Sequence, residues 1–351
     1  MDFELDDVVD RRWMVKESSL DDEQYAIRIL RNRNLLIEGC AGSGKTVLAL
    51  QKAKELEDSG ITDYLIVLYT RALLSFVKDG VLKLGIDPDK VWNFDQLEVS
   101  GYTEVDYIIV DEVQDFNELQ LHKLIQMAKK NFIFFGDDAQ QIYDQGLNLK
   151  NVMKVSKLQD ANHKKLTKNY RLPKTIARFA SYIKNDSDLV TRCVNEGGEP
   201  PRIIKCNNFF EELNWMKTII EKEYWTDVAI LVHNNDLVHE AEQYLKKLGL
   251  DVEKKVKEGN RNIENLDFYS SKPKLMTYHS SKGLQFEHVF MPGCEISTTK
   301  HNYQQAVYVA TTRASETLDI LYSNQLSPFI SCIPKDLYDF QELNNNKEII
   351  T

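Results

Sequence analysis

The strongest constraint on this chain is a glycine-rich loop, Gly-Cys-Ala-Gly-Ser-Gly-Lys-Thr, at residues 39–46. The apolar residues 35–38 before it predict a short buried strand, and residues 46–56 after it have helical periodicity. A loop between a strand and a helix presents backbone N–H groups and a helix N-terminus to the β- and γ-phosphates of a nucleotide. The sequence therefore predicts a site for nucleoside triphosphate.

Several residues of this loop have separate predicted roles. Gly42 and Gly44 permit the tight backbone. Lys45 reaches the phosphates, and the Thr46 hydroxyl is placed to bind Mg²⁺. The other loop residues expected to contact the nucleotide are Gly39, Ala41 and Ser43. The alternative is a glycine-rich turn with a chance lysine, and the flanking strand and helix argue against it.

Two acidic residues lie at the end of a second predicted strand, residues 107–111. Asp111 is placed to hold Mg²⁺ directly or through water, and Glu112 is placed to orient and deprotonate the attacking water. After a third strand at residues 132–135, a Gly-Asp-Asp-Ala-Gln segment places the amide of Gln140 beside the phosphates. Either segment alone could be a polar turn. Together with the loop they predict an enzyme that hydrolyses nucleoside triphosphate, with ATP and Mg²⁺ as cofactors.

Length and composition are typical of a cytoplasmic enzyme of two domains. At 351 residues the chain exceeds what one hydrophobic core usually supports. Its five cysteines are widely spaced and include no Cys-x-x-Cys pair, which favours reduced thiols over a disulfide framework or a zinc site. No apolar run approaches about 18 residues, and the chain begins too acidic for a signal peptide, so we expect no membrane association.

The charge distribution gives two opposing indications about nucleic acid. The formal net charge of −10 opposes binding to a polyanion. The charge is uneven, because residues 1–22 hold three basic and eight acidic side chains whereas residues 150–184 hold ten basic and one acidic. Such a basic segment can bind phosphates even on an acidic protein, and the alternative is a solvated lysine-rich surface.

Short apolar runs alternate with longer amphipathic segments, which predicts an α/β fold of parallel sheets covered by helices. The other expected strands are residues 64–69, 202–205, 228–232, 275–278, 288–291 and 318–322. The pattern loosens near residue 155. We therefore expect an acidic segment at 1–18, a first lobe at 19–155, a second lobe at 156–336 and a C-terminal tail at 337–351.

The ordered set of motifs resembles the core of the UvrD/Rep/PcrA-type superfamily 1 helicases over about residues 20–325. Residues 20–24 resemble the Q motif, 69–73 the segment called Ia, 166–171 motif IV, 277–286 motif V and 308–314 motif VI. These segments and the three motifs described above arrive in the family's order. The resemblance implies two RecA-like lobes, each a parallel sheet flanked by helices.

The resemblance also implies roles at the nucleotide. Its nucleotide-binding positions outside the loop are Gln24, Tyr170, Gly283 and Gln285. The position of Gln24 reads adenine, and that of Tyr170 stacks on the base. Arg171 and Arg313 correspond to arginines that contact the γ-phosphate from the second lobe, where a guanidinium stabilises the charge of the transition state. The implied catalytic set is Lys45, Glu112, Gln140, Arg171 and Arg313.

Five residues occupy positions that line the single-strand groove in the family: Thr70, Arg71, Tyr143, Thr277 and His279. The hydroxyls and Arg71 would contact phosphates, and Tyr143 could stack on a base. The implied partner is single-stranded nucleic acid, with DNA favoured over RNA. A lone histidine such as His279 is usually structural, which is the alternative at that position.

The chain also departs from the family. Only about ten residues separate the segment at 93–96 from the strand that leads to Asp111, and about forty separate Val232 from Thr277. In the family these two gaps hold large accessory domains. Asp144 and Gln145 stand where the family commonly has arginine and a strand-stacking tryptophan. The chain therefore resembles two bare motor lobes.

The sequence thus predicts an ATP-dependent nucleic-acid motor of the DNA helicase type. It would be a DNA-stimulated ATPase that translocates 3′ to 5′, with the polarity taken from the resemblance alone. The competing hypothesis is an ATP-driven switch that regulates a protein partner such as a nuclease and unwinds nothing. The missing accessory domains favour the switch, and the complete set of motor motifs opposes it. A small-molecule kinase is a distant third hypothesis, because two arginine-bearing motifs have no evident purpose there.

Overall fold

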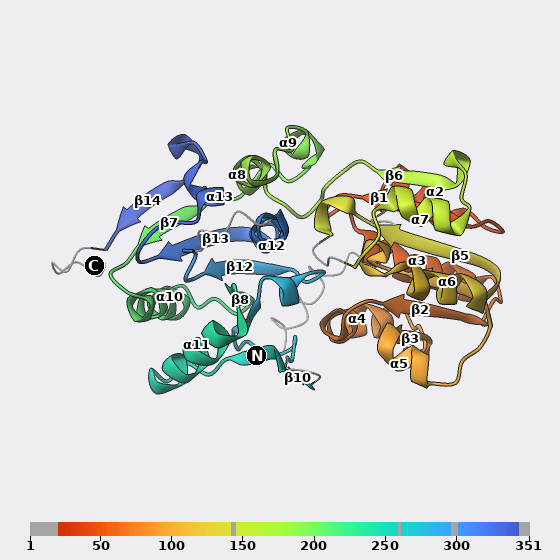
Figure 1. Cartoon of the computed structure of the whole chain (residues 1–351), viewed down its shortest axis with the longest axis horizontal. Helices are drawn as coiled ribbons and strands as arrows, with labels where there is room; N and C mark the ends of the chain where they lie inside the picture. Colours follow the sequence, from red (N-terminus) through yellow and green to blue (C-terminus); the bar gives the residue numbers. More distant parts are fainter. Residues whose placement is uncertain (1–19, 142–144, 259–260, 265, 296–300, 344–351) are drawn as a thin grey trace. The chain divides into compact units, whose positions relative to one another are not determined.

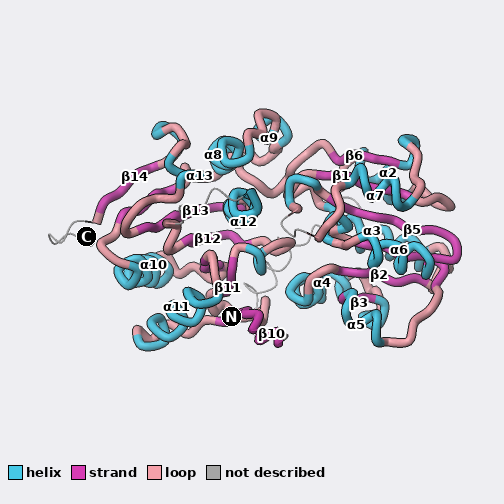
Figure 2. The backbone as a smooth tube through the Cα atoms, in the orientation of Figure 1, coloured by secondary structure: helices cyan, strands magenta, loops and turns pink. Residues whose placement is uncertain are grey.

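The computed structural model describes residues 20–141, 145–258, 261–264, 266–295 and 301–343, and the chain divides into two compact units, Met1–Tyr170 and Arg171–Thr351 (Figure 1). Each unit has its own sheet and its own hydrophobic core. Helices accompany both sheets (Figure 2), so the predicted α/β architecture is confirmed.

The first unit is built on six parallel strands in the order β3-β2-β4-β5-β1-β6. The strands are β1 (Leu35–Gly39), β2 (Tyr64–Leu68), β3 (Val91–Asn93), β4 (Val105–Val110), β5 (Ala128–Gly136) and β6 (His163–Leu166). The helices are α2 (Asp22–Ile29), α3 (Lys45–Asp58), α4 (Arg71–Lys83), α5 (Phe94–Val99), α6 (Glu118–Met127) and α7 (Leu149–Ser156). Short 3₁₀ turns are η2 (Pro88–Lys90), η3 (Val113–Asp115), η4 (Asp138–Gln140) and η5 (Asp160–Asn162).

Apolar side chains cover both faces of the central strands of this sheet. All five residues of β2 are buried, as are the last four of β4 and the last five of β5. One core cluster joins Val110 of β4 and Phe134 of β5 to Leu121 of α6 and Val152 of α7. Strands buried on both faces read as continuous apolar runs, which is why they were predictable.

The register of the sheet brings the predicted site residues to one edge. β1, β4 and β5 are parallel neighbours, with Glu38 opposite Gly136 and Val110 opposite Phe134. Their carboxyl ends therefore meet at the same edge of the sheet. The segments that follow these three ends are the glycine-rich loop, the Asp111 segment and the Gln140 segment.

The second unit is built on eight strands in the order β10-β9-β11-β8-β12-β13-β7-β14. They are β7 (Arg202–Lys205), β8 (Val228–Val232), β9 (Glu253–Glu258), β10 (Arg261–Glu264), β11 (Lys274–Thr277), β12 (Phe286–Met291), β13 (Ala314–Tyr322) and β14 (Asp339–Glu342). The helices are α8 (Lys174–Lys184), α9 (Leu189–Arg192), α10 (Phe209–Lys222), α11 (Asn235–Lys247), α12 (His301–Thr311) and α13 (Pro328–Ser331), with 3₁₀ turns η6 (His279–Ser281) and η7 (Lys335–Leu337).

Seven of these strands are parallel, and β10 pairs antiparallel with β9. The fully parallel sheet predicted for the second lobe is therefore correct except at this edge. Two residues separate β9 from β10, and a connection that short cannot form the crossover that parallel strands need. The core packs Met216 of α10 and Leu245 of α11 against Ile230 of β8.

Two predicted boundaries differ from the structure. Residues 156–170 were expected in the second lobe, but β6 pairs with β1 in the first sheet, with His163 opposite Leu36. The expected tail at 337–351 contains β14, whose Asp339 lies opposite Arg202 of β7. Both are polar edge strands, which have no apolar run to reveal them. The predicted acidic segment at 1–18 lies outside the described residues.

Candidate nucleotide-binding site

The glycine-rich loop connects the end of β1 to the start of α3, as predicted. Gly42 and Gly44 have φ angles of 78° and 82°, a left-handed conformation that glycine adopts without strain. A β-carbon at position 44 would lie 2.8 Å from Nε2 of Gln24. The loop therefore needs glycine here, and it leads the chain directly into the N-terminus of a 14-residue helix, where anions bind favourably.

The ammonium group of Lys45 lies against the backbone of this loop. Its Nζ donates to the carbonyl oxygens of Gly39 at 2.7 Å and Cys40 at 3.1 Å. The same nitrogen lies 3.9 Å from Oδ2 of Asp137, which follows β5. The positive charge is therefore held between the loop and the end of a neighbouring strand.

Thr46 and Asp111 are in direct contact. The Thr46 hydroxyl donates to Oδ2 of Asp111 at 2.6 Å, while Oδ1 of Asp111 accepts from the backbone N–H of Glu112 at 3.0 Å. Burial, together with the adjacent Glu112 carboxylate, raises the pKa of Asp111 to about 6. A hydroxyl and a carboxylate are the oxygen donors that Mg²⁺ prefers, and a cation beside Asp111 would favour its ionised form. The pair thus fits the predicted metal site.

Glu112 occupies an uncommon backbone conformation. Its φ of 57° and ψ of 43° lie in the left-handed region, which costs a residue with a side chain about 1 kcal/mol or more. This turn redirects the chain immediately after β4 and precedes η3. The Glu112 carboxylate is buried, and its Oε2 accepts a hydrogen bond from Nε2 of Gln114. The predicted water-activating group is therefore held in one orientation.

Gln140 lies on the turn that follows β5. The side chain of Asp137 caps this turn by accepting from the backbone N–H of Ala139 at 2.9 Å. Nε2 of Gln140 donates to Oδ2 of Asp137 at 2.8 Å, the same oxygen that faces Lys45. Asp137 therefore joins the predicted Gln140 to the predicted Lys45.

Gln24 and Tyr170 both form hydrogen bonds with neighbouring residues of the glycine-rich loop. Gln24 forms a capping box with Asp21 at the start of α2, and its Nε2 donates to the carbonyl oxygen of Ser43 at 3.0 Å. The backbone N–H of Tyr170 donates to the carbonyl oxygen of Gly42 at 3.0 Å, and its hydroxyl donates to Oδ2 of Asp21. Burial, and then the bond to Asp21, raises the pKa of Tyr170. Tyr170 was expected in the second lobe, but it belongs to the first unit.

The remaining predicted nucleotide contacts lie in the second unit. Arg171 is its first residue, and the Arg171 carbonyl accepts from Asn195 Nδ2 at 3.5 Å. The guanidinium of Arg313 donates to the carbonyl oxygens of Val309 at 2.9 Å and Leu284 at 3.0 Å. These contacts place Arg313 beside the segment that carries the two other predicted positions, Gly283 and Gln285. The nucleotide contacts of all four residues stay predictions.

Two of the predicted nucleic-acid residues lie at the carboxyl ends of parallel strands. Thr70 comes shortly after the end of β2, and Thr277 is the last residue of β11. Oγ1 of Thr70 accepts from the backbone N–H of Leu73 at 3.2 Å and thereby caps α4. Thr277 Oγ1 lies 3.0 Å from the hydroxyl of Ser280. His279 begins η6, and Arg71 begins α4. Tyr143 lies outside the described residues.

Sequence reasoning gave no role to several residues that the structure brings to this edge. Gln114 and Asp137 lie inside motifs that were recognised, but their contacts join segments distant in the sequence. Gln145, at the expected tryptophan position, donates from Nε2 to the hydroxyl of Tyr69 at 3.2 Å. No local pattern signals these partners, because each pairing depends on the sheet register.

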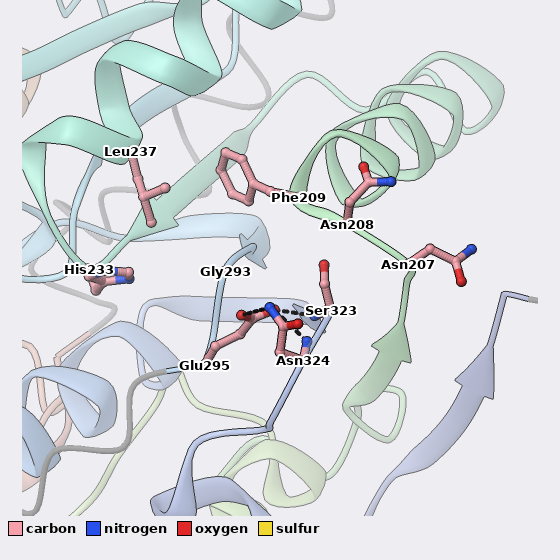
Figure 3. A pocket seen from close by; sticks show the side chains of 9 residues that line it. All are labelled: Asn207, Asn208, Phe209, His233, Leu237, Gly293, Glu295, Ser323 and Asn324. Carbon is pink, nitrogen blue, oxygen red and sulfur yellow. Dashed lines mark hydrogen bonds between the residues drawn. The ribbon is translucent and has the colours of Figure 1, made fainter.

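The second unit has a pocket of its own, with a cavity volume of about 340 Å³ (Figure 3). It lies at the carboxyl ends of β7, β8, β12 and β13 and is lined by Asn207, Asn208, Phe209, His233, Leu237, Gly293, Glu295, Ser323 and Asn324. Oε2 of Glu295 accepts from Nδ2 of Asn324 at 2.8 Å. Behind this lining, buried Glu212 accepts from the Gly293 N–H at 2.6 Å and from the Ser323 hydroxyl.

The fold and the site define an α/β nucleotide-binding core made of two RecA-like units, with the phosphate-binding loop in the first. Residues 23–145 match the family described as AAA domain, and residues 274–321 match the UvrD-like helicase C-terminal domain. These two matches, with the relatives described next, support a UvrD/Rep/PcrA-like superfamily 1 helicase core.

Curated relatives agree with this assignment. The ATP-dependent DNA helicase PcrA of Bacillus subtilis is 31% identical over 159 residues, which are 41% of this chain and 22% of that protein. A probable DNA helicase II homolog of Mycoplasma capricolum is 30% identical over 155 residues, 40% of this chain and 21% of that protein. DNA helicase II of Haemophilus influenzae is 30% identical over 143 residues, 37% of this chain and 19% of that protein. The matched part spans about a fifth of these relatives.

Among solved structures, the C-terminal domain of a possible DNA helicase from Lactobacillus matches 49% of this chain and 98% of that chain, with 21% identity and a TM-score of 0.39. In the part of the chain that the structure describes, no helix is long and apolar enough to span a membrane.

Proposed function

We propose that this chain is an ATP-dependent nucleic-acid motor of the DNA helicase type, in which hydrolysis of ATP with Mg²⁺ is stimulated by single-stranded DNA. The contact between the Thr46 hydroxyl and Asp111 Oδ2, at 2.6 Å, carries this proposal. It joins the phosphate-binding loop to the acidic strand end, and these are the two elements that such a site requires. The relatives named as DNA helicases support DNA as the nucleic acid.

In this proposal, residues of the first unit have separate roles in ATP hydrolysis. Bound ATP and Mg²⁺ would supply the reactive phosphoryl group and the cation that offsets its charge. Thr46 and Asp111 hold oxygens for that cation. The Glu112 carboxylate, fixed by Gln114, accepts a proton from the attacking water.

Positive charge and amide groups stabilise the transition state in this proposal. Lys45 contacts the phosphates from the loop, and Gln140 lies within the same network through Asp137. Arg171 and Arg313 would add guanidinium groups from the second unit, so that hydrolysis depends on both units.

Translocation from 3′ to 5′ is the polarity that the family resemblance supports, and we infer a cytoplasmic location.

A specific observation favours a second candidate, an ATP-driven switch that regulates a protein partner such as a nuclease. Gln145 takes the place of a base-stacking aromatic residue and is bonded to Tyr69. The connection from α5 to β4 runs only from residue 100 to residue 104, so no accessory domain is inserted there. Both features would weaken duplex separation without affecting ATP hydrolysis.

Phosphate release from ATP, measured at low salt with no nucleic acid and with single-stranded DNA, single-stranded RNA or duplex DNA, tests the proposal. The Lys45→Ala variant controls for contaminating ATPases. We expect turnover in the wild-type chain that single-stranded DNA increases several-fold. Turnover that ignores every nucleic acid but responds to a co-purifying protein would replace the motor with the switch. No turnover above the Lys45→Ala variant under any condition would refute both.

A further inference from the structure

Gln114 connects two motifs through the two ends of its side-chain amide. Nε2 donates to Oε2 of Glu112, while Oε1 accepts the backbone N–H of Asp137 at 3.1 Å. Glu112 follows β4, whereas Asp137 follows the neighbouring strand β5 and lies 23 residues beyond Gln114. The Gln114 amide therefore connects Glu112, the group expected to activate water, to the turn that carries Gln140.

The Gln114 side chain is closely packed. Gln114 is fully buried, with 0% of its surface exposed. A β-carbon at Gly136 would lie 2.9 Å from Gln114 Oε1, and one at Gly146 would lie 2.3 Å from the Gln114 carbonyl oxygen. Real β-carbons do not approach atoms so closely, so a side chain at position 146 would displace the Gln114 backbone, and one at position 136 would displace the Gln114 amide or the side chains beside it. Close packing and a hydrogen bond at each end of a buried amide hold its orientation.

The connection continues past Asp137. Its carboxylate accepts from Nε2 of Gln140 at 2.8 Å and lies 3.9 Å from Nζ of Lys45. Glu112, Gln114, Asp137 and Gln140 therefore form a continuous series of contacts along the carboxyl edge of the sheet. Glu112 is thus connected through Gln114 to Asp137, the residue whose carboxylate accepts from Gln140.

We propose that Gln114 is a positioning residue for ATP hydrolysis, which holds the Glu112 carboxylate in register with the Gln140 turn. This inference rests on the proposed ATPase function. The amide nitrogen can donate to a carboxylate while the amide oxygen accepts from an N–H group. A methionine of similar length would make neither bond, and a glutamate would keep the acceptor but present a second carboxylate to Glu112. Misplacement of a reacting group by about 1 Å can cost about 100-fold in rate.

The test compares Gln114→Met with Gln120→Met in steady-state ATP hydrolysis and in direct binding of a fluorescent ATP analogue. Gln120 is a matched control, since its side chain also bonds a backbone N–H, that of Asn117, but it does so in the capping box of α6. We expect Gln114→Met to lower kcat by about 10- to 100-fold and to change nucleotide affinity by less than about 3-fold. Gln120→Met should leave both values near wild type.

A double-mutant cycle separates positioning from general damage to the fold. If Gln114 acts through Glu112, adding Gln114→Met to a Glu112→Gln chain should cause almost no further loss of kcat. Gln114→Glu provides a second variant of nearly unchanged volume, in case the methionine chain folds poorly, and it should show the same selective loss of kcat.

The two failures are distinguishable. A wild-type chain without ATP turnover would refute the proposed function itself. A wild-type chain that hydrolyses ATP, loses activity with Glu112→Gln and keeps its full kcat with a folded Gln114 variant would overturn the positioning role alone. The positioning role would also be overturned if Gln114→Met lowered kcat by the same factor in the wild-type chain and in the Glu112→Gln chain.

Discussion

The backbone N–H of Tyr170 donates to the carbonyl oxygen of Gly42 at 3.0 Å, which fixes the last residue of the first unit to the phosphate-binding loop. The next residue, Arg171, is the first of the second unit. The residue expected to stack on the base and the residue expected to contact the γ-phosphate are therefore consecutive in the chain but belong to different units. This bond links the loop to the residue that directly precedes the second unit.

This relationship predicts separate effects for the ring and the hydroxyl of Tyr170. Tyr170→Ala should weaken ATP binding by about 3- to 10-fold, because an aromatic stack is worth about 0.5–1.5 kcal/mol. Tyr170→Phe keeps the ring and loses only the bond to Asp21, so it should bind ATP nearly as well as the wild type. Titration with a fluorescent ATP analogue measures both. Equal losses in the two variants would show that the hydroxyl, not the stacking ring, matters.

The arginines of the second unit should affect turnover more than binding. Arg171→Ala and Arg313→Ala should each lower kcat by about 10³-fold with a much smaller change in nucleotide affinity, because their charge acts mainly in the transition state. Replacement by lysine should rescue poorly, since a point charge lacks the planar fork. Arg178→Ala, on the exposed face of α8, is the matched control. Full activity in both alanine variants would mean that the first unit works alone.

Single-strand binding should be weak and depend strongly on salt. Gln145 stands where a stacking aromatic is expected, and the missing stack removes about 1–3 kcal/mol, so phosphate contacts carry most of the affinity. Fluorescence anisotropy with labelled single-stranded DNA at about 50 and 200 mM salt should show a steep loss of affinity. Gln145→Trp should bind more tightly. Salt-independent binding, or efficient duplex displacement by the unmodified chain, would contradict this account.

Glu212 should make the stability of the second unit depend on pH. Burial raises its pKa from the ordinary 4.5 to about 7. Between these values the folded chain keeps a proton that the unfolded chain has lost, so the free energy of unfolding falls as pH rises through this window and levels off above it. Glu212→Gln removes this titration and should be more stable than wild type at pH 8, by on the order of 1–3 kcal/mol. Thermal unfolding at several pH values tests this, and parallel profiles for the two chains would disprove it.

Local sequence patterns predicted much of the fold because its central strands are continuous apolar runs. β2 and β8 are buried at every position, so composition alone reveals them. The polar strands β6 and β14 escaped prediction because each lies at a sheet edge and gains its place from pairing rather than from apolar side chains. Their assignment moved the boundary between the units and shortened the expected tail.

Part of the candidate site could likewise be predicted from the sequence, and part could not. Lys45, Thr46 and Asp111 were identifiable because motif spacing places them at the ends of β1 and β4, and their contacts in the structure fit the proposed roles. The bond from Gln114 to Asp137 depends on the register between β4 and β5, which the sequence does not display. Motifs therefore indicate the type of site, whereas its internal connections require the structure.

The central claim is that the site at the carboxyl edge of the first sheet hydrolyses ATP with Glu112 as the group that activates water. The most direct measurement is phosphate release by the wild-type chain and by Glu112→Gln, with Mg²⁺ and saturating single-stranded DNA, alongside ATP binding to each. We predict that Glu112→Gln binds ATP as the wild type does but turns it over at least about 10²-fold more slowly. Turnover close to wild type in that variant would contradict the account.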